Sequence, residues 1–448
     1  AKNTSIHYQN IKINIVDTPG HADFGGEVER TLAMVDGVML LVDASEGPLP
    51  QTCFVLKKAL EAKLTPIVCI NKIDRPDARV DAVLDEIYDL FIDLDASEDQ
   101  LDFPVVYTNA RSGTATLDLK APGEDLKPMF ELIVQTLRGP LVDPAAPTQF
   151  QANNLDYNDY VGRLAVGRVK NGVLAPGQYM LCRADGSQQL VKITQVYGWQ
   201  GLKRVEVASA GAGDIAAIAG IDDIGIGVTI ADKDNPVGLP ILAVDEPTLN
   251  MDFMVNSSPL AGTEGKFVTS RQIRERLNKE LLTNVALRVE ETSDSDVFHV
   301  SGRGELHLTI LLENMRREGF ELACGKPRVV YKDIDGEKCE PYENLTIDLE
   351  DSNQGVIMEE LGRRRGELTN MESDGKGRTR LEYHIPARGL IGFQSDFMTM
   401  TRGTGLMSHI FDDYKPVKPD LPGRHNGVLI SQEDGEAVAY ALWKVEDR

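Results

Sequence analysis

Five consecutive residues near the start of the chain have the types needed to act on a phosphorylated ligand. The segment Asp17–His21 (DTPGH) follows an apolar run. The Asp17 carboxylate could hold Mg²⁺ through a water molecule, since magnesium beside phosphates usually keeps part of its hydration shell. The backbone N–H of Gly20 could approach a γ-phosphate closely because no side chain intervenes. His21 follows directly, where it could orient a water molecule against that phosphate.

A second motif, Asn71–Asp74 (NKID), carries the groups that suit a guanine base. The Asp74 carboxylate can accept two N–H donors from the base edge, a pair that adenine lacks, and Asn71 can bind the same base. Lys72 can lay its stem along the base and hold the loop together, and the backbone N–H of Ala110 could donate to the base oxygen. Each motif alone occurs by chance, but both together at strand ends predict a site for GTP or GDP with Mg²⁺.

The elements that must position these residues follow from the hydrophobic pattern. Segment 80–94 has apolar residues recurring every three and four positions, which predicts a helix. Short apolar runs alternate with such segments, so we predict parallel strands with helices on both faces of one sheet. Ligands collect at the carboxyl ends of such strands, where polar residues occur here. The four predicted strands are Ile11–Val16, Val38–Val42, Ile67–Ile70 and Val105–Tyr107, and the polar residues after them are Asp17, Asp43, Asn71 and Asn109.

One expected motif is missing from the sequence. No G-x-x-x-x-G-K-[ST] phosphate loop occurs in the 448 residues, and the chain begins at Ala1 rather than at a methionine. We therefore expect the first strand and the phosphate loop of the nucleotide-binding domain to lie upstream. Because phosphoryl transfer depends on positioning and charge stabilisation, we expect this chain by itself to hydrolyse GTP negligibly.

Composition restricts the class of protein. A chain of 448 residues is too long for one core, so three or four domains are expected. A net charge of −23 argues against indiscriminate coating of nucleic acid, although local basic clusters remain possible. The five cysteines form no C-x-x-C pair, which favours reduced thiols and a reducing compartment. No segment has the features of a signal peptide or a membrane span, and we expect no membrane partner.

The pattern along the chain predicts five regions. A proline-rich connector, Pro140–Pro147, ends the nucleotide-binding domain. Short β-rich runs such as Tyr160–Lys170 and Leu190–Tyr197, separated by glycine and proline turns, predict a small β-barrel. Two stretches with β-α-β-β-α order then predict ferredoxin-like modules. The predicted regions are 1–142, an incomplete P-loop-type α/β GTPase domain; 143–235, the barrel; 240–327 and 328–420, the two ferredoxin-like α+β domains; and 421–448, the start of a C-terminal domain.

Several segments resemble translational GTPases. Segments 17–24 (DTPGHADF) and 42–47 (VDASEG) are similar to the switch regions of that family, and segment 301–308 (SGRGELHL) resembles the third domain of elongation factor G-like proteins. The domain that interrupts elongation factor G after this point has no counterpart here. Segments 264–271, 386–393 and 426–431 resemble the BipA/TypA family most closely; LepA also lacks the interrupting domain but fits the final segment less well.

The resemblance carries expectations about activity. In translational GTPases the histidine after the glycine orients the hydrolytic water, and we carry that role to His21. The last guanine loop of the family has Ser-Ala where this chain has Asn109-Ala110-Arg111. The resemblance therefore supports a contact between the base and the backbone of Ala110 more than a contact through any side chain of this loop. The resemblance implies a ribosome-stimulated GTPase that contacts rRNA and A-site tRNA, acts in ribosome assembly or stress-responsive translation, and is a cytoplasmic monomer. An organelle stroma is the alternative location.

Two other functions stay open at this point. The protein could be a non-catalytic scaffold that docks on the ribosome or RNA, or a LepA-like elongation factor. A scaffold would need a basic face, and a charge run on its own is more often a solvated helix surface. The candidate RNA contacts are Arg363, Arg364, Arg365, Lys376, Arg378 and Arg380.

Overall fold

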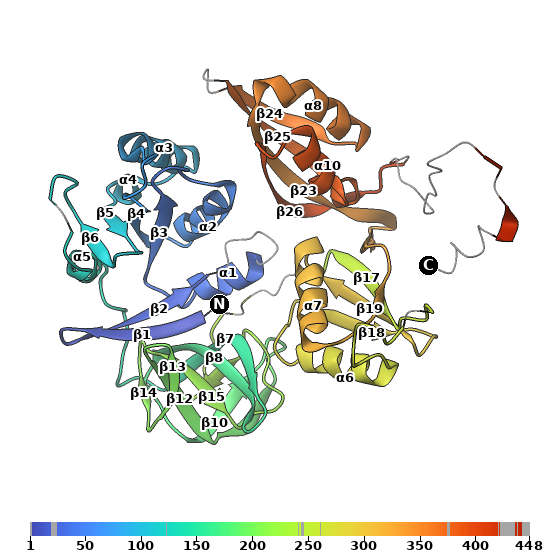
Figure 1. The fold of residues 1–448 in the computed structure, drawn as a ribbon. Coiled ribbons are helices and arrows are strands. Elements are labelled where there is room, and N and C mark those ends of the chain that lie inside the picture. The colour runs from blue at the N-terminus through green and yellow to red at the C-terminus, as the bar shows by residue number, and fades with distance from the viewer. Residues whose placement is uncertain are drawn as a thin grey trace. The chain divides into compact units, whose positions relative to one another are not determined.

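The computed structural model describes most of the chain and divides it into two compact units, Ala1–Val244 and Asp245–Arg448. The described residues are 2–18, 25–121, 123–240, 242, 246–259, 261–373, 377–419, 421, 435–436 and 438–440. Figure 1 gives the course of the chain.

The first unit begins with a hairpin and continues with a mostly parallel α/β sheet. Strands β3, β4 and β5 are parallel, and β6 closes one side antiparallel to β5. The strands are β1 (Lys2–Tyr8), β2 (Ile11–Asp17), β3 (Gly37–Asp43), β4 (Thr65–Asn71), β5 (Val105–Asn109) and β6 (Thr114–Thr116). The helices are α1 (Gly25–Leu32), α2 (Pro50–Glu61), α3 (Val80–Asp93), α4 (Glu98–Leu101) and α5 (Lys127–Thr136).

Helices cover both faces of this sheet, as the alternating pattern predicts (Figure 1). One apolar cluster joins β3 and β4 to α2 and α3, and a second joins the opposite face of β4 and β5 to α5. The predicted helix over 80–94 is confirmed as α3, because its apolar residues recur on the face that meets the sheet. Val83, Ile87, Leu90 and Phe91 are its buried residues.

The prediction that the first apolar run joins this sheet is wrong. Strand β2 pairs antiparallel with β1, in register from Lys2 opposite Asp17 to Tyr8 opposite Ile11, and forms a separate two-stranded sheet. Only Gln9 and Asn10 connect the two strands, and so short a loop favours a local antiparallel partner. Among the described strands, none pairs with the free edge of β2 or with the outer edge of β3.

A β-domain completes the first unit. Its main sheet has the order β11-β10-β16-β7-β8-β15-β12-β13, and Figure 1 shows it curling round as a barrel. The predicted single run Leu190–Tyr197 is two strands, divided at Thr194. The strands are β7 (Gln149–Asn158), β8 (Gly162–Asn171), β9 (Val173–Leu174), β10 (Gly177–Cys182), β11 (Gln188–Ile193), β12 (Gln195–Gln200), β13 (Lys203–Val207), β14 (Ala210–Gly211), β15 (Ile215–Ala219) and β16 (Thr229–Ala231).

The second unit opens with a βαββαβ module. Its sheet has the order β18-β19-β17-β20, with β21 also paired to β17, and α6 and α7 pack against it. Thr269 and Gln272 form a capping box that starts α6, and Gly319 ends α7 with a φ of 94°. The elements are β17 (Leu249–Met254), α6 (Ser270–Glu280), β18 (Arg288–Glu291), β19 (Val297–Gly302), α7 (Glu305–Glu318), β20 (Ala323–Cys324) and β21 (Arg328–Val329).

A second α+β module follows. The sheet has the order β22-β23-β25-β24, and β26 pairs with β23. All seven residues of β24 are exposed, so no apolar alternation marks this strand in the sequence. The elements are β22 (Lys332–Ile334), β23 (Glu337–Glu350), a 3₁₀ turn (Asp351–Asn353), α8 (Gln354–Arg363), β24 (Glu367–Ser373), β25 (Arg378–Pro386), α9 (Ala387–Leu390), α10 (Phe393–Met400) and β26 (Leu406–Pro416).

Within the described ranges, no helix is both long enough and apolar enough to cross a bilayer.

Candidate functional site

Three of the predicted polar strand ends lie side by side at one edge of the parallel sheet. Asp43 ends β3, Asn71 ends β4 and Asn109 ends β5. Asp43 stands opposite Asn71 in the register of β3 and β4, and Asn71 stands opposite Thr108 in the register of β4 and β5. The loops that follow these strands therefore start from neighbouring positions, where an open α/β sheet binds its ligands.

The Asn71 side chain connects two of these loops. Its Oδ1 accepts hydrogen bonds of 3.1 Å from the Thr108 hydroxyl and of 3.1 Å from the backbone N–H of Ala110. The sequence predicts that the Ala110 N–H donates to the base oxygen, and in this structure the same N–H donates to Asn71. Asn71 thus fixes the distance between the NKID loop and the loop after β5, and its Nδ2 donors are the atoms left for a base.

Lys72 is held by a carboxylate outside its own motif. Its Nζ donates to Oδ2 of Asp43 at 2.6 Å, and its backbone has a φ of 63°, the left-handed region that non-glycine residues seldom adopt. The Lys72 side chain is 54% exposed, whereas that of Asp43 is only 11% exposed. The ammonium is therefore anchored at the sheet edge while the stem faces solvent.

Hydrogen bonds control the charge state of Asp43. Its burial would by itself raise its pKa, but donation from Lys72 and from the N–H and hydroxyl of Ser45 outweighs burial and holds the pKa far below the usual range. Asp43 is therefore ionised at neutral pH.

Asp74 differs from its neighbours in the same loop. It is exposed, and within the described part of the chain its carboxylate makes no hydrogen bond or ion pair. An acidic side chain next to two cations would ordinarily be expected to pair with one of them, but Lys72 is bound to Asp43 and Arg75 to Asp77. Both oxygens of Asp74 remain available to accept two donors from a ligand.

Arg79 is a functional candidate that no sequence motif indicated. Its Nε donates to the carbonyl of Ser45 at 2.7 Å, and its Nη2 donates to the carbonyl of Glu46 at 3.0 Å. Its backbone N–H donates to the carbonyl of Ala44. Glu86 of α3 holds the same guanidinium. Arg79 therefore pins the loop after β3 against α3, and only contacts between residues far apart in sequence reveal this.

The phosphate half of the predicted site is only partly described. Asp17 is exposed at the end of β2, in a different sheet from Asp43 and Asn71. Gly20 and His21 lie outside the described residues. Among the residues that are described, no three His, Cys, Asp or Glu side chains gather closely enough to hold a metal ion. One exposed carboxylate fits Mg²⁺ that is held mainly by substrate phosphates and water, and does not fit an all-protein metal cage.

The candidate RNA contacts have different environments. Arg363 is 64% exposed and pairs with Glu359 on its own helix, and Arg365 is exposed, whereas Lys376 lies outside the described residues. Arg380 pairs with Asp348 across the sheet. Arg378 is exposed at the start of β25.

Arg364 is the exception within this set. Its side chain is only 16% exposed, and it binds Glu360, Asp396 and the carbonyl of Gly389. It also lies over the ring of Phe393. Its guanidinium links α8 to α10 and is already paired, so Arg364 is a poor candidate for RNA contact.

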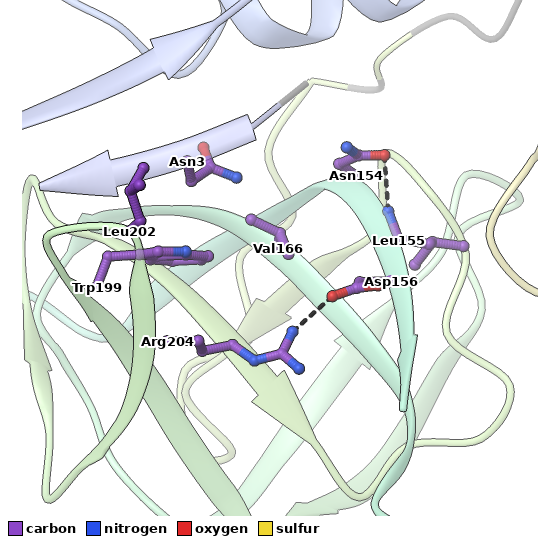
Figure 2. A pocket seen from close by; sticks show the side chains of 8 residues that line it. All are labelled: Asn3, Asn154, Leu155, Asp156, Val166, Trp199, Leu202 and Arg204. Atoms are coloured by element: carbon purple, nitrogen blue, oxygen red, sulfur yellow. Dashed lines mark hydrogen bonds and ion pairs between the residues drawn. The ribbon is translucent and has the colours of Figure 1, made fainter. Parts of the chain in front are cut away.

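A separate cavity of about 250 Å³ lies where β1 meets the barrel. Figure 2 shows its lining side chains, with Arg204 directed at Asp156. That ion pair is 2.5 Å long, and the cavity includes none of the predicted guanine-site residues. The lining residues are Asn3, Asn154, Leu155, Asp156, Val166, Trp199, Leu202 and Arg204.

Comparison with known families assigns most of this architecture. Residues 1–139 match the family described as elongation factor Tu GTP binding domain, and residues 162–231 match elongation factor Tu domain 2. Residues 337–425 match elongation factor G C-terminus. A solved structure of a Thermus thermophilus protein aligns with a TM-score of 0.61 at 15% identity, covering 93% of this chain and 89% of that one, which shows a shared fold.

Curated relatives are much closer in sequence. The large ribosomal subunit assembly factor BipA of Escherichia coli (strain K12) is 56% identical over 450 aligned positions, covering 100% of this chain and 74% of the relative. The proteins of the same name from Bacillus subtilis (strain 168) and Haemophilus influenzae are 52% and 56% identical, with 74% and 73% of their lengths covered. This chain belongs to the BipA family of translational GTPases.

Proposed function

We propose that this protein binds GTP and GDP through the NKID loop and hydrolyses GTP to GDP and phosphate. Asp74 would accept the N–H donors of guanine, Asn71 would donate to the base from Nδ2, and Lys72 would cover one face of it. The observation that supports this most is the unpaired Asp74 carboxylate beside two cations that are already bound to other carboxylates. An acceptor kept free in this way suits a ligand edge with two donors.

The hydrolytic step is proposed for the residues around the first motif. His21 would orient the attacking water, and the Gly20 N–H would contact the γ-phosphate. Asp17 would hold Mg²⁺ through water, and the bound ion supplies charge neutralisation of the phosphates. These roles rest on the match of the motif to the family, together with the exposure of Asp17.

Base selectivity tests the guanine site. We expect Asp74→Asn in the full-length protein to weaken GDP binding by about a hundredfold, because one of two charge-assisted hydrogen bonds becomes a clash between donors. The same variant should bind xanthosine diphosphate better than the unaltered protein does, since xanthine presents an oxygen where guanine presents an amino group. Isothermal titration calorimetry with GDP, xanthosine diphosphate (XDP) and ADP measures the three affinities. Unchanged GDP affinity would exclude Asp74 as the base-reading residue.

We further propose that the protein acts on the large ribosomal subunit in the cytosol, as a monomer that contacts rRNA and A-site tRNA. The support is its identity with relatives named as large ribosomal subunit assembly factors. The division into domains 1–142, 143–235, 240–327, 328–420 and 421–448 is part of the same proposal.

The salt dependence of ribosome binding tests the basic face. Replacing Arg363 and Arg365 together by glutamine should make the plot of log K for ribosome binding against log salt less steep, by about one to two units of slope. The reason is that each phosphate contact releases counterions. Lys127→Gln is the matched control, since Lys127 is an exposed cation, 71% accessible, on α5 of the other unit. Identical slopes for the double variant and the control would remove this face from the proposal.

A further inference from the structure

We infer that Asp43 is a positioning residue for guanine recognition: its carboxylate anchors the ammonium of Lys72 and thereby fixes the Lys72 stem where the base binds. The inference rests on the guanine site proposed above and adds to it a residue that lies outside the NKID motif. It also predicts that the loop after β3 and the loop after β4 act as one structure.

The anchor is part of the sheet rather than of a loop. Asp43 is the last residue of β3 and stands opposite Asn71, the last residue of β4. The distance of 2.6 Å between Lys72 Nζ and Asp43 Oδ2 is that of a charge-assisted hydrogen bond. Because the carboxylate projects from a paired strand end, the ammonium is tied to the most rigid part of this edge.

The second carboxylate oxygen prevents Asp43 from turning away. Oδ1 accepts the backbone N–H of Ser45 at 2.9 Å and its hydroxyl at 2.8 Å. Arg79 holds the Ser45 carbonyl from the other side at 2.7 Å, and the N–H of Ala44 donates to the carbonyl of Asn71 at 2.9 Å. Each oxygen of Asp43 is therefore used, one for the turn and one for Lys72.

The backbone of Lys72 sets the direction of its side chain, and an anchor keeps the side chain in that direction. With a φ of 63°, the residue sits in the left-handed region, which directs its side chain differently from those of a continuing strand. A free lysine side chain samples many rotamers, and ordering it on binding reduces affinity. Anchoring the ammonium beforehand leaves the exposed stem already in place when the base arrives.

A competing cation does not take over this role. Arg75 NH1 lies 3.7 Å from Asp43 Oδ2, but its guanidinium makes two closer bonds to Asp77, of 2.9 Å and 2.8 Å. Asp77 is also an aspartate in the same loop, it is 58% exposed, and its ion-pair partner is Arg75 rather than Lys72. This makes Asp77 a matched control for Asp43.

The first experiment compares GDP binding by the full-length protein and by two single variants of it. Asp43→Asn keeps the shape of the side chain and removes the charge that holds Lys72. We expect GDP affinity to fall by about tenfold, the effect of losing one charge-assisted hydrogen bond. Asp77→Asn should change it by less than about twofold, in line with an exposed ion pair.

A double-mutant cycle separates positioning from general support of the fold. If Asp43 acts through Lys72, then Asp43→Asn should cost less than about twofold in GDP affinity when Lys72 is already methionine. A purely structural role would give the same loss in both backgrounds and would lower the urea midpoint equally in both. Asp43→Glu, which keeps the charge, should recover part of the affinity.

Three results would overturn the inference: unchanged GDP affinity for Asp43→Asn, increased affinity, or equal losses with and without Lys72. The Asp74→Asn variant, titrated in parallel, distinguishes the reasons. If it keeps full GDP affinity, then the guanine site itself is misplaced. If it loses affinity while Asp43→Asn does not, then the site stands and only the anchoring role of Asp43 is wrong.

Discussion

Individual side chains at the proposed guanine site differ in which of their atoms are already hydrogen-bonded. Asn71 uses its oxygen to join two loops, Lys72 uses its ammonium to bind Asp43, and Asp74 keeps both oxygens free. In the proposed guanine site, Asn71 would hold two loops together and also donate to the base, Lys72 would cover the base, and Asp74 would accept from its edge. A motif search alone treats all three as equivalent contacts.

Another single residue, Glu321, organises a loop in the second unit. Its carboxylate accepts the backbone N–H groups of Gly262 at 2.8 Å, Glu264 at 3.1 Å and Gly265 at 2.9 Å, and the Asn256 side chain at 2.7 Å. Hydrogen bonds from Gly262 and Gly265 are the main reason that the pKa of Glu321 falls to about 2. The ordinary value for a glutamate is near 4.5.

We predict that this loop opens in Glu321→Gln, because a carboxamide has one acceptor oxygen where the carboxylate has two. Hydrogen exchange at the amides of Gly262, Glu264 and Gly265 should become faster by about tenfold or more. In the unaltered protein the pKa of Glu321 is lower in the folded state than in the unfolded state. Glu321 therefore stabilises the loop fully at pH values above its ordinary pKa, and this stabilisation is lost as the pH falls through about 2.

Glu313→Gln is the control for that prediction. The pKa of Glu313 also falls to about 2, but its partners are the exposed guanidinium groups of Arg316 and Arg317 on the same helix. It holds no loop, so its replacement should leave the exchange of these three amides unchanged. Equal acceleration in both variants would mean that Glu321 does not hold the loop.

At the scale of elements, the barrel holds the C-terminal end of α1, the first helix after the DTPGH motif in the sequence. Donors from β7 and β8 reach the backbone carbonyls at the C-terminal end of α1, which has no further helical turn to satisfy them. Burial lowers the pKa of the Lys170 ammonium, which is one of these donors. The bonds are Asn153 Nδ2 to Arg30 O at 3.1 Å, Lys170 Nζ to Ala33 O at 3.0 Å and Arg168 NH1 to Met34 O at 3.1 Å, and Arg168 also pairs with Asp36 at 2.7 Å.

Arg168→Met should therefore destabilise the first unit by about 2–3 kcal/mol, because it leaves a carbonyl and a carboxylate without their buried donor. Arg168 is 5% exposed and its bond to the Met34 carbonyl is buried, so little water can replace that bond. The urea midpoint of the first unit measures the change. Arg183→Met is the control, since the partner of Arg183, Asp223, is 94% exposed and the pair should contribute less than about 0.5 kcal/mol. Equal urea midpoints for the two variants would show that the bonds from Arg168 to Met34 and Asp36 do not stabilise the first unit.

At the scale of the whole molecule, the chain folds as two units with separate cores. Phe150 in the barrel and Phe253 in β17 are each fully buried, at 0% exposure, on opposite sides of the boundary after Val244. Two-state unfolding of the entire chain is therefore not expected.

Calorimetry should resolve at least two transitions, and each phenylalanine should affect one of them. Phe150→Ala should lower the transition of the first unit, and Phe253→Ala that of the second, each by about 3–5 kcal/mol of unfolding free energy. Each variant serves as the control for the other. A single transition that shifts equally in both would show that the two units unfold together.

Much of this molecule follows from local sequence signals. The periodicity of segment 80–94 is enough to predict α3, because a helix with one buried face repeats its apolar residues every three to four positions. Likewise, Asp43, Asn71 and Asn109 end their strands as predicted, because parallel strands end where buried apolar runs give way to polar residues. The family motifs also identified the translational GTPase family, because their residue types recur at fixed spacing in its members.

Other features depended on contacts between residues far apart in sequence. The pairing of β2 with β1, the bond from Asp43 to Lys72 and the enclosure of Arg364 between α8 and α10 have no local pattern. A hydrogen-bonding edge, a carboxylate or a guanidinium looks the same in sequence whether its partner is solvent, substrate or another strand. Only the folded chain decides which partner is within reach, because distance and burial set the strength of these interactions.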